Sequence, residues 1–345
     1  MDIIELPVAD EWPHRPGPEA LWQESIVLTW QDVDQSIGGV IRIGQHPNRG
    51  LGICTFGIVE KSGIGFNHSL ANIPLKATDR FETGFAIGDF LRVEFAKNDS
   101  RWVAHDKDCD FDLTVTNLHP LYDTWALVGL NNRFREKFAA SHTEVAGLVR
   151  GTIRLGDKHW TINGYGYRDH SWGVRDHSDS SAQLVNLFWL VGSFGKDLVV
   201  CACETVSASG GRFNTGFVIR DGELDRPVVK DISFVVDADG ISTRGGRCVL
   251  ETNKFGVFDL QIDGIGNVVL GMQGESADAT SYFEIGMPSS MRWNGKTGGV
   301  HLSSMFNARG ATRPPARLYG ISLQQGLYTV PRWTPSASLA DFKDI

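Results

Sequence analysis

The chain consists of short apolar runs with β-type alternation, separated by glycine-containing turns. In Asp110–Asn117, for example, Phe111, Leu113 and Val115 are apolar and the residues between them are polar. A period of two puts every second side chain on one face of a strand. Asp-Gly or Asn-Gly pairs, such as Asn294-Gly295, close several of these runs, as in tight antiparallel hairpins. The pattern therefore predicts an all-β protein of the sandwich or barrel type, and not a parallel βαβ sheet.

Helical periodicity is rare along the chain, so we expect only a few short helices. The best helical pattern is Asn131–Ser141, where two phenylalanines stand four positions apart. Strand-like runs precede and follow this charged segment. We place a domain boundary near Asp179, which gives an N-terminal domain of residues 1–179 and a C-terminal domain of residues 180–345.

A glycine-framed cluster of polar and aromatic residues, Gly164–Gly173, lies near the middle of the chain. The alternating run before it, Gly147–Ile162, predicts a strand that enters the cluster. Continued extended geometry divides the side chains between two faces: Tyr165, Tyr167 and Asp169 on one, and Arg168, His170 and Trp172 on the other. A carboxylate, an imidazole and phenols this close together can bind and protonate a small molecule. The alternative is a structural salt bridge between Asp169 and Arg168, with Trp172 filling the core.

The composition is that of a folded protein and excludes several classes of function. Of 345 residues, 41% are hydrophobic and 21% are charged, and the net charge is −8. No Lys/Arg-rich run is available to neutralise a phosphate backbone, and no run approaches the roughly 18 apolar residues of a membrane helix. The N-terminus is acidic where a signal peptide is basic, and the five cysteines are odd in number and scattered. We expect a cytoplasmic protein with no nucleic-acid partner, no stable membrane insertion and no disulfides.

The sequence predicts neither a metal nor a bound cofactor. His170 and His177 lie near Asp169 and other carboxylates, but their spacing has no ligand geometry on a strand or loop. Gly38-Gly39 lacks the strand–loop–helix context of a dinucleotide fingerprint. Arg42, in the strand candidate after these glycines, is expected to be a solvated arginine. The alternative is that Arg42 sits inside a barrel as the partner of a carboxylate or amide.

The segment Gly164–Gly173 resembles the Gly-x-Gly-x-Arg-Asp-His-Ser-Trp-Gly signature of the carotenoid 1,2-hydratase (hydroxyneurosporene synthase-like) superfamily. The upstream Gly38–Gly44 and the turn Pro47–Gly50 are similar to the first domain of a bacterial branch of that superfamily. The similarity spans about Trp30 to Gln325. It implies two lipocalin-like β-barrel domains packed side by side, with a mainly apolar site near their junction, and an architecture related to that of fungal Diels–Alderases.

The resemblance also implies a range of activities, because known members hydrate a carotenoid double bond while fungal relatives fold a polyene for cycloaddition. We expect a cofactor-independent hydratase, dehydratase or isomerase for an apolar molecule such as a terpenoid, steroid-like or polyketide compound. Asp169 would donate a proton if burial raises its pKa, and His170 would activate water as the base. The alternative is a ligand-binding or pericyclase-type scaffold in which no proton moves.

Aromatic side chains complete the candidate site. The catalytic candidates are Asp169, His170 and Tyr167. The substrate-binding candidates are Trp172, Tyr165, Arg168, Trp125 and Trp189. An aromatic face stabilises a cationic intermediate by about 0.5–2 kcal/mol. The expected partner is therefore an apolar small molecule. The sequence leaves open whether the chain also forms a homodimer.

Overall fold

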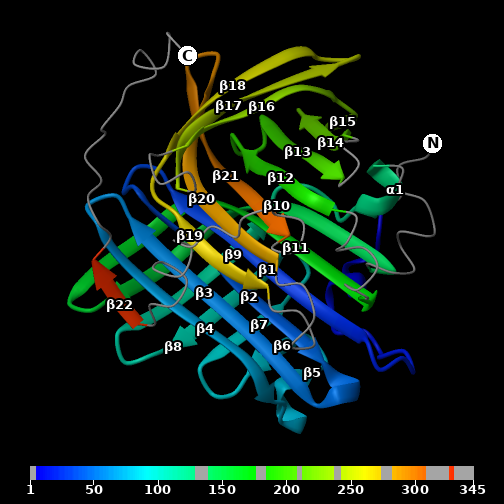
Figure 1. The fold of residues 1–345 in the computed structure, drawn as a ribbon, viewed down its shortest axis with the longest axis vertical. Coiled ribbons are helices and arrows are strands. Elements are labelled where there is room, and N and C mark those ends of the chain that lie inside the picture. The colour runs from blue at the N-terminus through cyan, green and yellow to red at the C-terminus, as the bar shows by residue number, and fades with distance from the viewer. Residues whose placement is uncertain are drawn as a thin grey trace.

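The computed structural model describes residues 5–128, 139–175, 184–207, 212–236, 242–272, 282–307 and 326–329. These residues form two antiparallel sheets with very little helix (Figure 1). The helical elements are α1 (Thr124–Val128) and three 3₁₀ turns, η1 (Val8–Glu11), η2 (Pro47–Arg49) and η3 (Ala77–Asp79). The prediction of an all-β protein with few short helices is confirmed.

The first sheet follows the order β22-β4-β3-β2-β1-β11-β10-β9-β8-β7-β6-β5. Its strands are β1 (Trp22–Asp32), β2 (Ile37–His46), β3 (Leu51–Glu60), β4 (Ile64–Pro74), β5 (Arg80–Phe81), β6 (Gly84–Ile87), β7 (Leu91–Phe95), β8 (Asp99–His105), β9 (Cys109–Asn117), β10 (Ser141–Leu155), β11 (Lys158–Val174) and β22 (Gly326–Thr329). The sheet curls around its own apolar core, to which Trp30, Phe56 and Trp102 contribute fully buried rings.

The second sheet follows the order β15-β14-β13-β12-β21-β20-β18-β17-β16, and β19 pairs with β20. Its strands are β12 (Leu184–Ser193), β13 (Leu198–Ser207), β14 (Arg212–Arg220), β15 (Glu223–Asp225), β16 (Val228–Val236), β17 (Thr243–Thr252), β18 (Gly256–Gly264), β19 (Val268–Met272), β20 (Tyr282–Trp293) and β21 (Lys296–Asn307). Asp221-Gly222 and Asn294-Gly295 close hairpins with positive φ at both residues, which is the geometry that these pairs predict.

The two curled sheets are half-barrels, so the molecule has two lipocalin-like β-domains. Strands β1–β11 lie in the first sheet and β12–β21 in the second, while β22 returns to pair with β4. The predicted boundary at Asp179 lies outside the described residues, and the division at 179/180 stays a prediction. Residues 131–138 of the expected helix also lie outside them, and Ser141 already belongs to β10.

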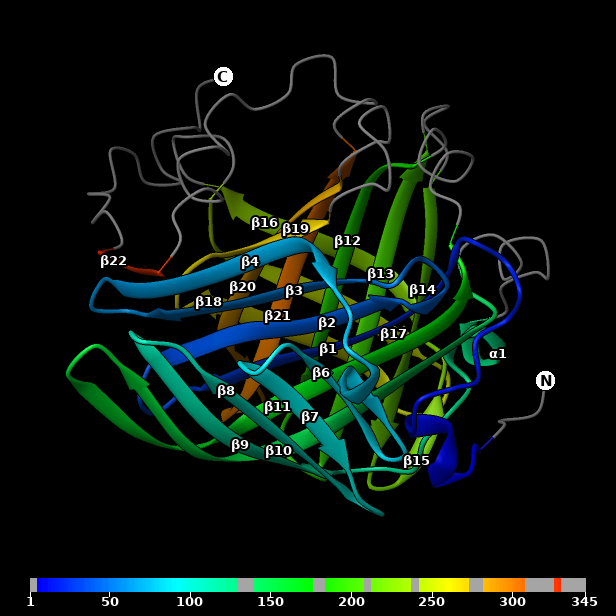
Figure 2. The ribbon, with the colours of Figure 1, turned by 90° about the horizontal axis from the view of Figure 1, so that it is seen from below.

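The two half-barrels pack against each other through one face of the first sheet. In Figure 2, β12, β13 and β21 cross behind β1, β2 and β11 at a steep angle. A buried cluster joins the sheets, with Tyr167 of β11 packed among Val191, Cys201 and Phe217. Strands β1, β2 and β11 therefore present one face to the first barrel's core and the other to the second sheet.

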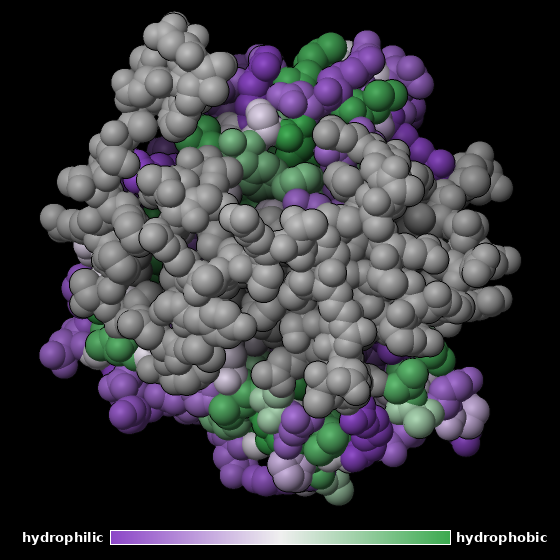
Figure 3. Space-filling model, viewed as in Figure 1, coloured by the Kyte–Doolittle hydropathy of each residue, from purple (hydrophilic) through white to green (hydrophobic). Residues whose placement is uncertain are grey.

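The described surface mixes polar and apolar side chains, as the face in Figure 3 shows. Its exposed large apolar residues include Leu70, Val228 and Val257. No helix in the described part of the chain is long and apolar enough to cross a bilayer.

Candidate functional site

Strand β11 carries the central motif through the middle of the first sheet, between β1 and β10. Its backbone is crowded at the motif's first glycine, because a Cβ on Gly164 would lie 2.2 Å from the carbonyl oxygen of Gln31. At the other end Gly173 has φ +122°, and a Cβ there would lie 2.5 Å from the backbone nitrogen of Ala140. The glycines therefore let the neighbouring strands approach closely, as their sequence pattern predicts.

The side chains of the motif divide between two faces, as the alternation predicts. Asp169 and Tyr167 point to the interface between the sheets, where Tyr167 packs against Trp189 of β12. His170 and Arg168 point into the first barrel, where both lie beside Phe95. One strand thus supplies polar groups to two separate sites.

The interface cluster, which consists of His142, Glu144, Tyr167, Asp169 and Cys201, contains two hydrogen-bonded groups joined by an ion pair between His142 and Glu144. The Nε2 atom of His142 lies 2.7 Å from Oδ2 of Asp169, and 3.7 Å from Oε1 of Glu144. Oε2 of Glu144 accepts hydrogen bonds from the Tyr167 hydroxyl at 3.0 Å and from the Cys201 thiol at 3.2 Å. Antiparallel register accounts for the grouping, since Glu144 of β10 lies directly opposite Asp169 of β11.

The electrostatics of the cluster set the protonation state of its imidazole. Burial alone would raise the pKa of Asp169, but His142, with the more distant Arg175 and Arg42, brings it below its ordinary value. Burial likewise opposes the charge on His142, yet Asp169 and Glu144 raise its pKa. The expectation that burial leaves Asp169 with a raised pKa is therefore corrected. Each member of the pair therefore favours the charged form of the other.

Two further carboxyl groups at the interface behave in the opposite way. Burial raises the pKa of Glu144, and burial raises the pKa of Glu284, on β20, to about 6. Arg42 of β2 faces the same interface and donates from Nε to the Ser25 hydroxyl at 3.1 Å. With 6% exposure Arg42 is buried, so the solvated arginine expected from the sequence is wrong. The alternative placed Arg42 inside a barrel as a carboxylate or amide partner; it lies instead at the interface, where Glu284 and Asp169 favour its charge.

Aromatic rings close over the interface cluster. The ring of Trp125, from α1, lies 4.3 Å from that of His142 in an edge-on arrangement, and its Nε1 donates to the carbonyl of Ala139. The ring of Trp189 lies 6.0 Å from that of Tyr167. The Asp169 side chain keeps 22% exposure, so the carboxylate is only partly covered by these rings.

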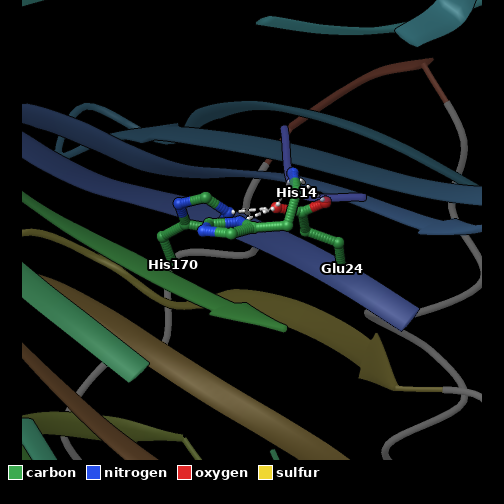
Figure 4. A group of neighbouring side chains, drawn as sticks. All are labelled: His14, Glu24 and His170. Atoms are coloured by element: carbon green, nitrogen blue, oxygen red, sulfur yellow. Dashed lines mark hydrogen bonds and ion pairs between the residues drawn. The ribbon is translucent and has the colours of Figure 1, made fainter. Parts of the chain in front are cut away.

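The opposite face of β11 forms a second polar group, the barrel cluster, which consists of His14, Glu24 and His170 (Figure 4). Trp172 stacks on the ring of His14 at 3.7 Å. Arg168 forms a buried ion pair with Glu11 and donates to Oδ1 of Asn117 at 2.7 Å. Arg168 is therefore not the counter-charge of Asp169.

The structure thus brings together some of the candidate residues and separates others. The candidates on the interface side are Asp169, Tyr167, Tyr165, Trp125 and Trp189. Those on the barrel side are His170, Trp172 and Arg168. His142 and Glu144 were missed because they adjoin the helix-prone segment. A strand extended back to Ser141 would have placed His142 and Glu144 on the same face, because every second residue of a strand points the same way.

Among the described residues, two groups of side chains have donor sets that could hold a metal ion. They are His142, Glu144 and Asp169 at the interface, and His14, Glu24 and His170 in the barrel; within each group the candidate ligand atoms lie within 4.8 Å of one another. Both groups lie near arginines, because Arg42 and Arg175 lower the pKa of Asp169 and Arg80 pairs with Glu24. The interface group also holds an imidazole within hydrogen-bond distance of a partly exposed carboxylate, an arrangement that suits proton transfer.

Comparison with known proteins supports the fold. Residues 7–308 match the family described as Domain of unknown function (DUF7064). None of the curated proteins compared with the chain matches it in sequence. The chain is similar in structure to an AttH candidate from Nitrosomonas europaea, with 14% identity, a TM-score of 0.63 and coverage of 88% of this chain and 97% of that one.

Two further solved structures share the architecture. CghA, in a crystal structure with Sch210972, is 9% identical with a TM-score of 0.57, over 86% of this chain and 94% of that one. Kievitone hydratase from Nectria haematococca is 12% identical with a TM-score of 0.51, over 84% of this chain and 90% of that one. These similarities agree with the superfamily inferred from the motif at the level of fold.

Proposed function

The chain belongs to the DUF7064 family, and we propose that it is an enzyme that adds water to, removes water from, or shifts a double bond in an apolar small molecule. The reaction would take place at the interface cluster, with no proton carrier other than the chain's own residues. The substrate class that we propose is a terpenoid, steroid-like or polyketide compound. A hydratase among the structural neighbours, the kievitone hydratase, and CghA, crystallised with Sch210972, are consistent with this class.

One observation carries the proposal: the imidazole of His142 lies against the carboxylate of Asp169, and each favours the charged form of the other. Nε2 of His142 and Oδ2 of Asp169 are 2.7 Å apart, and the two side chains keep 11% and 22% exposure. The Nδ1 atom of His142 is buried and has no hydrogen-bond partner among the described residues. With Nε2 held by Asp169, Nδ1 is the nitrogen left to donate a proton to a bound molecule.

For hydration, we assign the proton donor to His142 and its orientation to Asp169. The imidazolium N–H would protonate one carbon of a double bond, which leaves a cation on the neighbouring carbon. The rings of Trp125 and Trp189 lie where they could stabilise that charge. Glu144, whose pKa is raised by burial, would take a proton from the attacking water, since a carboxylate with a raised pKa is a stronger base. Dehydration is the same sequence in reverse.

A second function, a scaffold that positions an apolar ligand without proton transfer, has its own support. Glu144 accepts hydrogen bonds from Tyr167 and Cys201 inside the interface. A buried hydrogen-bond network of this kind can have a purely structural role, in which it holds the two sheets together. Rate enhancement would then come from positioning alone.

The test uses an organic-solvent extract of the host's cells and water labelled with the heavy oxygen isotope. Mass spectrometry would follow apolar compounds that gain a labelled hydroxyl, lose water or change retention time. We expect the wild-type protein and the exposed-site control Asp99→Asn to give the product, and Asp169→Asn to give none. A product formed equally by Asp169→Asn would support the scaffold, and no change with the wild-type protein would contradict the enzyme.

A further inference from the structure

The barrel cluster is a further group of titratable side chains among the described residues, and the proposed reaction does not use it. Its members come from three segments: His14 precedes β1, Glu24 lies on β1 and His170 lies on β11. Figure 4 shows both imidazoles directed at the same carboxylate. We propose that these three side chains form a binding site for a divalent transition metal of the zinc class. The site lies on the opposite face of β11 from the interface cluster and is independent of it.

The donor atoms lie close to the separations that a metal requires. Oε1 of Glu24 lies 2.7 Å from Nδ1 of His14 and 2.9 Å from Nε2 of His170. Ligands around a tetrahedral ion with bonds of about 2.1 Å are about 3.4 Å apart, so small outward shifts of the imidazoles would be enough. The ion would replace the two protons that now link the imidazoles to the carboxylate, so the cluster needs little rearrangement to bind it.

The surroundings hold the ligands in place. The ring of His14 is stacked on Trp172 at 3.7 Å, and that of His170 lies parallel to Phe95 at 6.2 Å. The Glu24 and His170 side chains are 0% and 1% exposed. Packing on apolar rings fixes the orientation of both imidazoles, which lowers the entropic cost of assembling a metal site.

The Glu24 carboxylate is also oriented by contacts other than those to the two imidazoles. Its Oε2 forms an ion pair with Arg80, and the backbone N–H of His14 lies 3.1 Å from Oε1 and 3.2 Å from Oε2. The ion pair with Arg80 leaves Oε1 directed at the imidazoles, as the outer contacts of metal-binding carboxylates do.

The donor set selects the class of metal. Calcium and magnesium require several oxygen ligands, whereas this site offers two imidazoles and one carboxylate next to the positive charge of Arg80. Imidazole suits zinc, copper, iron and nickel, and two histidines with one carboxylate are a common set for such ions. His14 is 22% exposed, which gives an ion a route from solvent and leaves coordination positions for water.

The consequence of binding would be to fasten the N-terminal segment across the first barrel. His14 is the ligand from that segment, and Glu11 in the same segment already pairs with Arg168 of β11. A bound ion would add a second link between this segment and β11.

The test is metal binding by the full chain after removal of metals with a chelator. We would titrate the protein with Zn²⁺ against a chromophoric competitor and with Co²⁺ by visible absorption. The wild-type protein is expected to bind one Zn²⁺ with His14 as a ligand. His14→Ala is expected to weaken binding by about a hundredfold or more, since even outer-shell changes cost 10–100-fold. His105→Ala, at an exposed histidine paired with Asp110, serves as the matched control and is expected to bind like the wild type.

A second variant separates this site from the interface group. In His142→Ala the Zn²⁺ affinity and the Co²⁺ spectrum are expected to be unchanged. Loss of binding in His142→Ala but not in His14→Ala would overturn the assignment, as would a wild-type protein that binds neither ion. The readout is binding, so these outcomes are independent of whether the interface cluster is catalytic.

Discussion

Replacing Asp169 with asparagine should reveal the charge state of the interface cluster through the pH dependence of stability. The substitution keeps the shape of the side chain and removes the charge that holds a proton on His142. A hydrogen bond to a charged group contributes roughly 1.5–3 kcal/mol, and this pair is 22% and 11% exposed, so we expect a loss of about 2 kcal/mol in mildly acidic solution.

The sign of the pH dependence follows from the two pKa shifts. The lowered pKa of Asp169 gives stability that is present above its ordinary value of 3.8 and is lost as the pH falls through the lower, folded value. The raised pKa of His142 gives stability that is complete below its ordinary value of 6.5 and is lost as the pH rises through the higher, folded value. The difference between wild type and Asp169→Asn should therefore be largest between these values and should shrink in alkaline solution.

The assay is urea unfolding followed by tryptophan fluorescence at about pH 5 and about pH 9. Glu144, Glu284, Arg42 and Arg175 also face this carboxylate or influence its pKa, so the same comparison is made in a His142→Gln background. We expect the pH dependence of the Asp169→Asn effect to vanish there, as a double-mutant cycle requires. An equal effect at both pH values in the wild-type background would refute the reasoning, because the partner of Asp169 would then be a permanent cation.

Two stability predictions concern the strand that carries both clusters. Arg168→Met should lower the free energy of unfolding by about 3–5 kcal/mol, because it leaves the carboxylate of Glu11 buried and unpaired. Arg101→Met, at an exposed ion pair, should have a much smaller effect, because solvent screens such pairs; similar losses in urea unfolding would contradict the burial of the first pair. Gly173→Ala should lower the free energy of unfolding by roughly 1–3 kcal/mol more than Gly222→Ala does. Both glycines have positive φ, but only a Cβ at position 173 would lie against Ala140. Equal losses of stability would show that the structure relieves this contact.

Much of the architecture follows from local sequence, and the site only in part. Asp110–Asn117 alternates cleanly and forms β9 as predicted, and the alternation of Gly164–Gly173 correctly separates the side of Asp169 from that of His170. Both features depend only on residues that are adjacent in the chain, and the two-residue period of a strand is enough to predict them.

The partners of Asp169 depend on contacts that sequence spacing does not contain. His142 lies 27 positions away and Glu144 is set opposite Asp169 by strand register. The pKa of Asp169 was expected to rise because alternation placed the nearest cation in the sequence, Arg168, on the opposite face and left burial as the main influence. Arg42 was expected in solvent, because an arginine on an isolated alternating strand is usually exposed, and only the packing of the second sheet buries it.

The central claim is that the reacting molecule meets the interface side of β11 and not its barrel side. The most direct measurement is to compare His142→Gln with His170→Gln in the labelled-water reaction. We expect the His142→Gln protein to form no product and the His170→Gln protein to form it at a rate near that of the wild type. Loss of product in His170→Gln with full activity in His142→Gln would contradict the account.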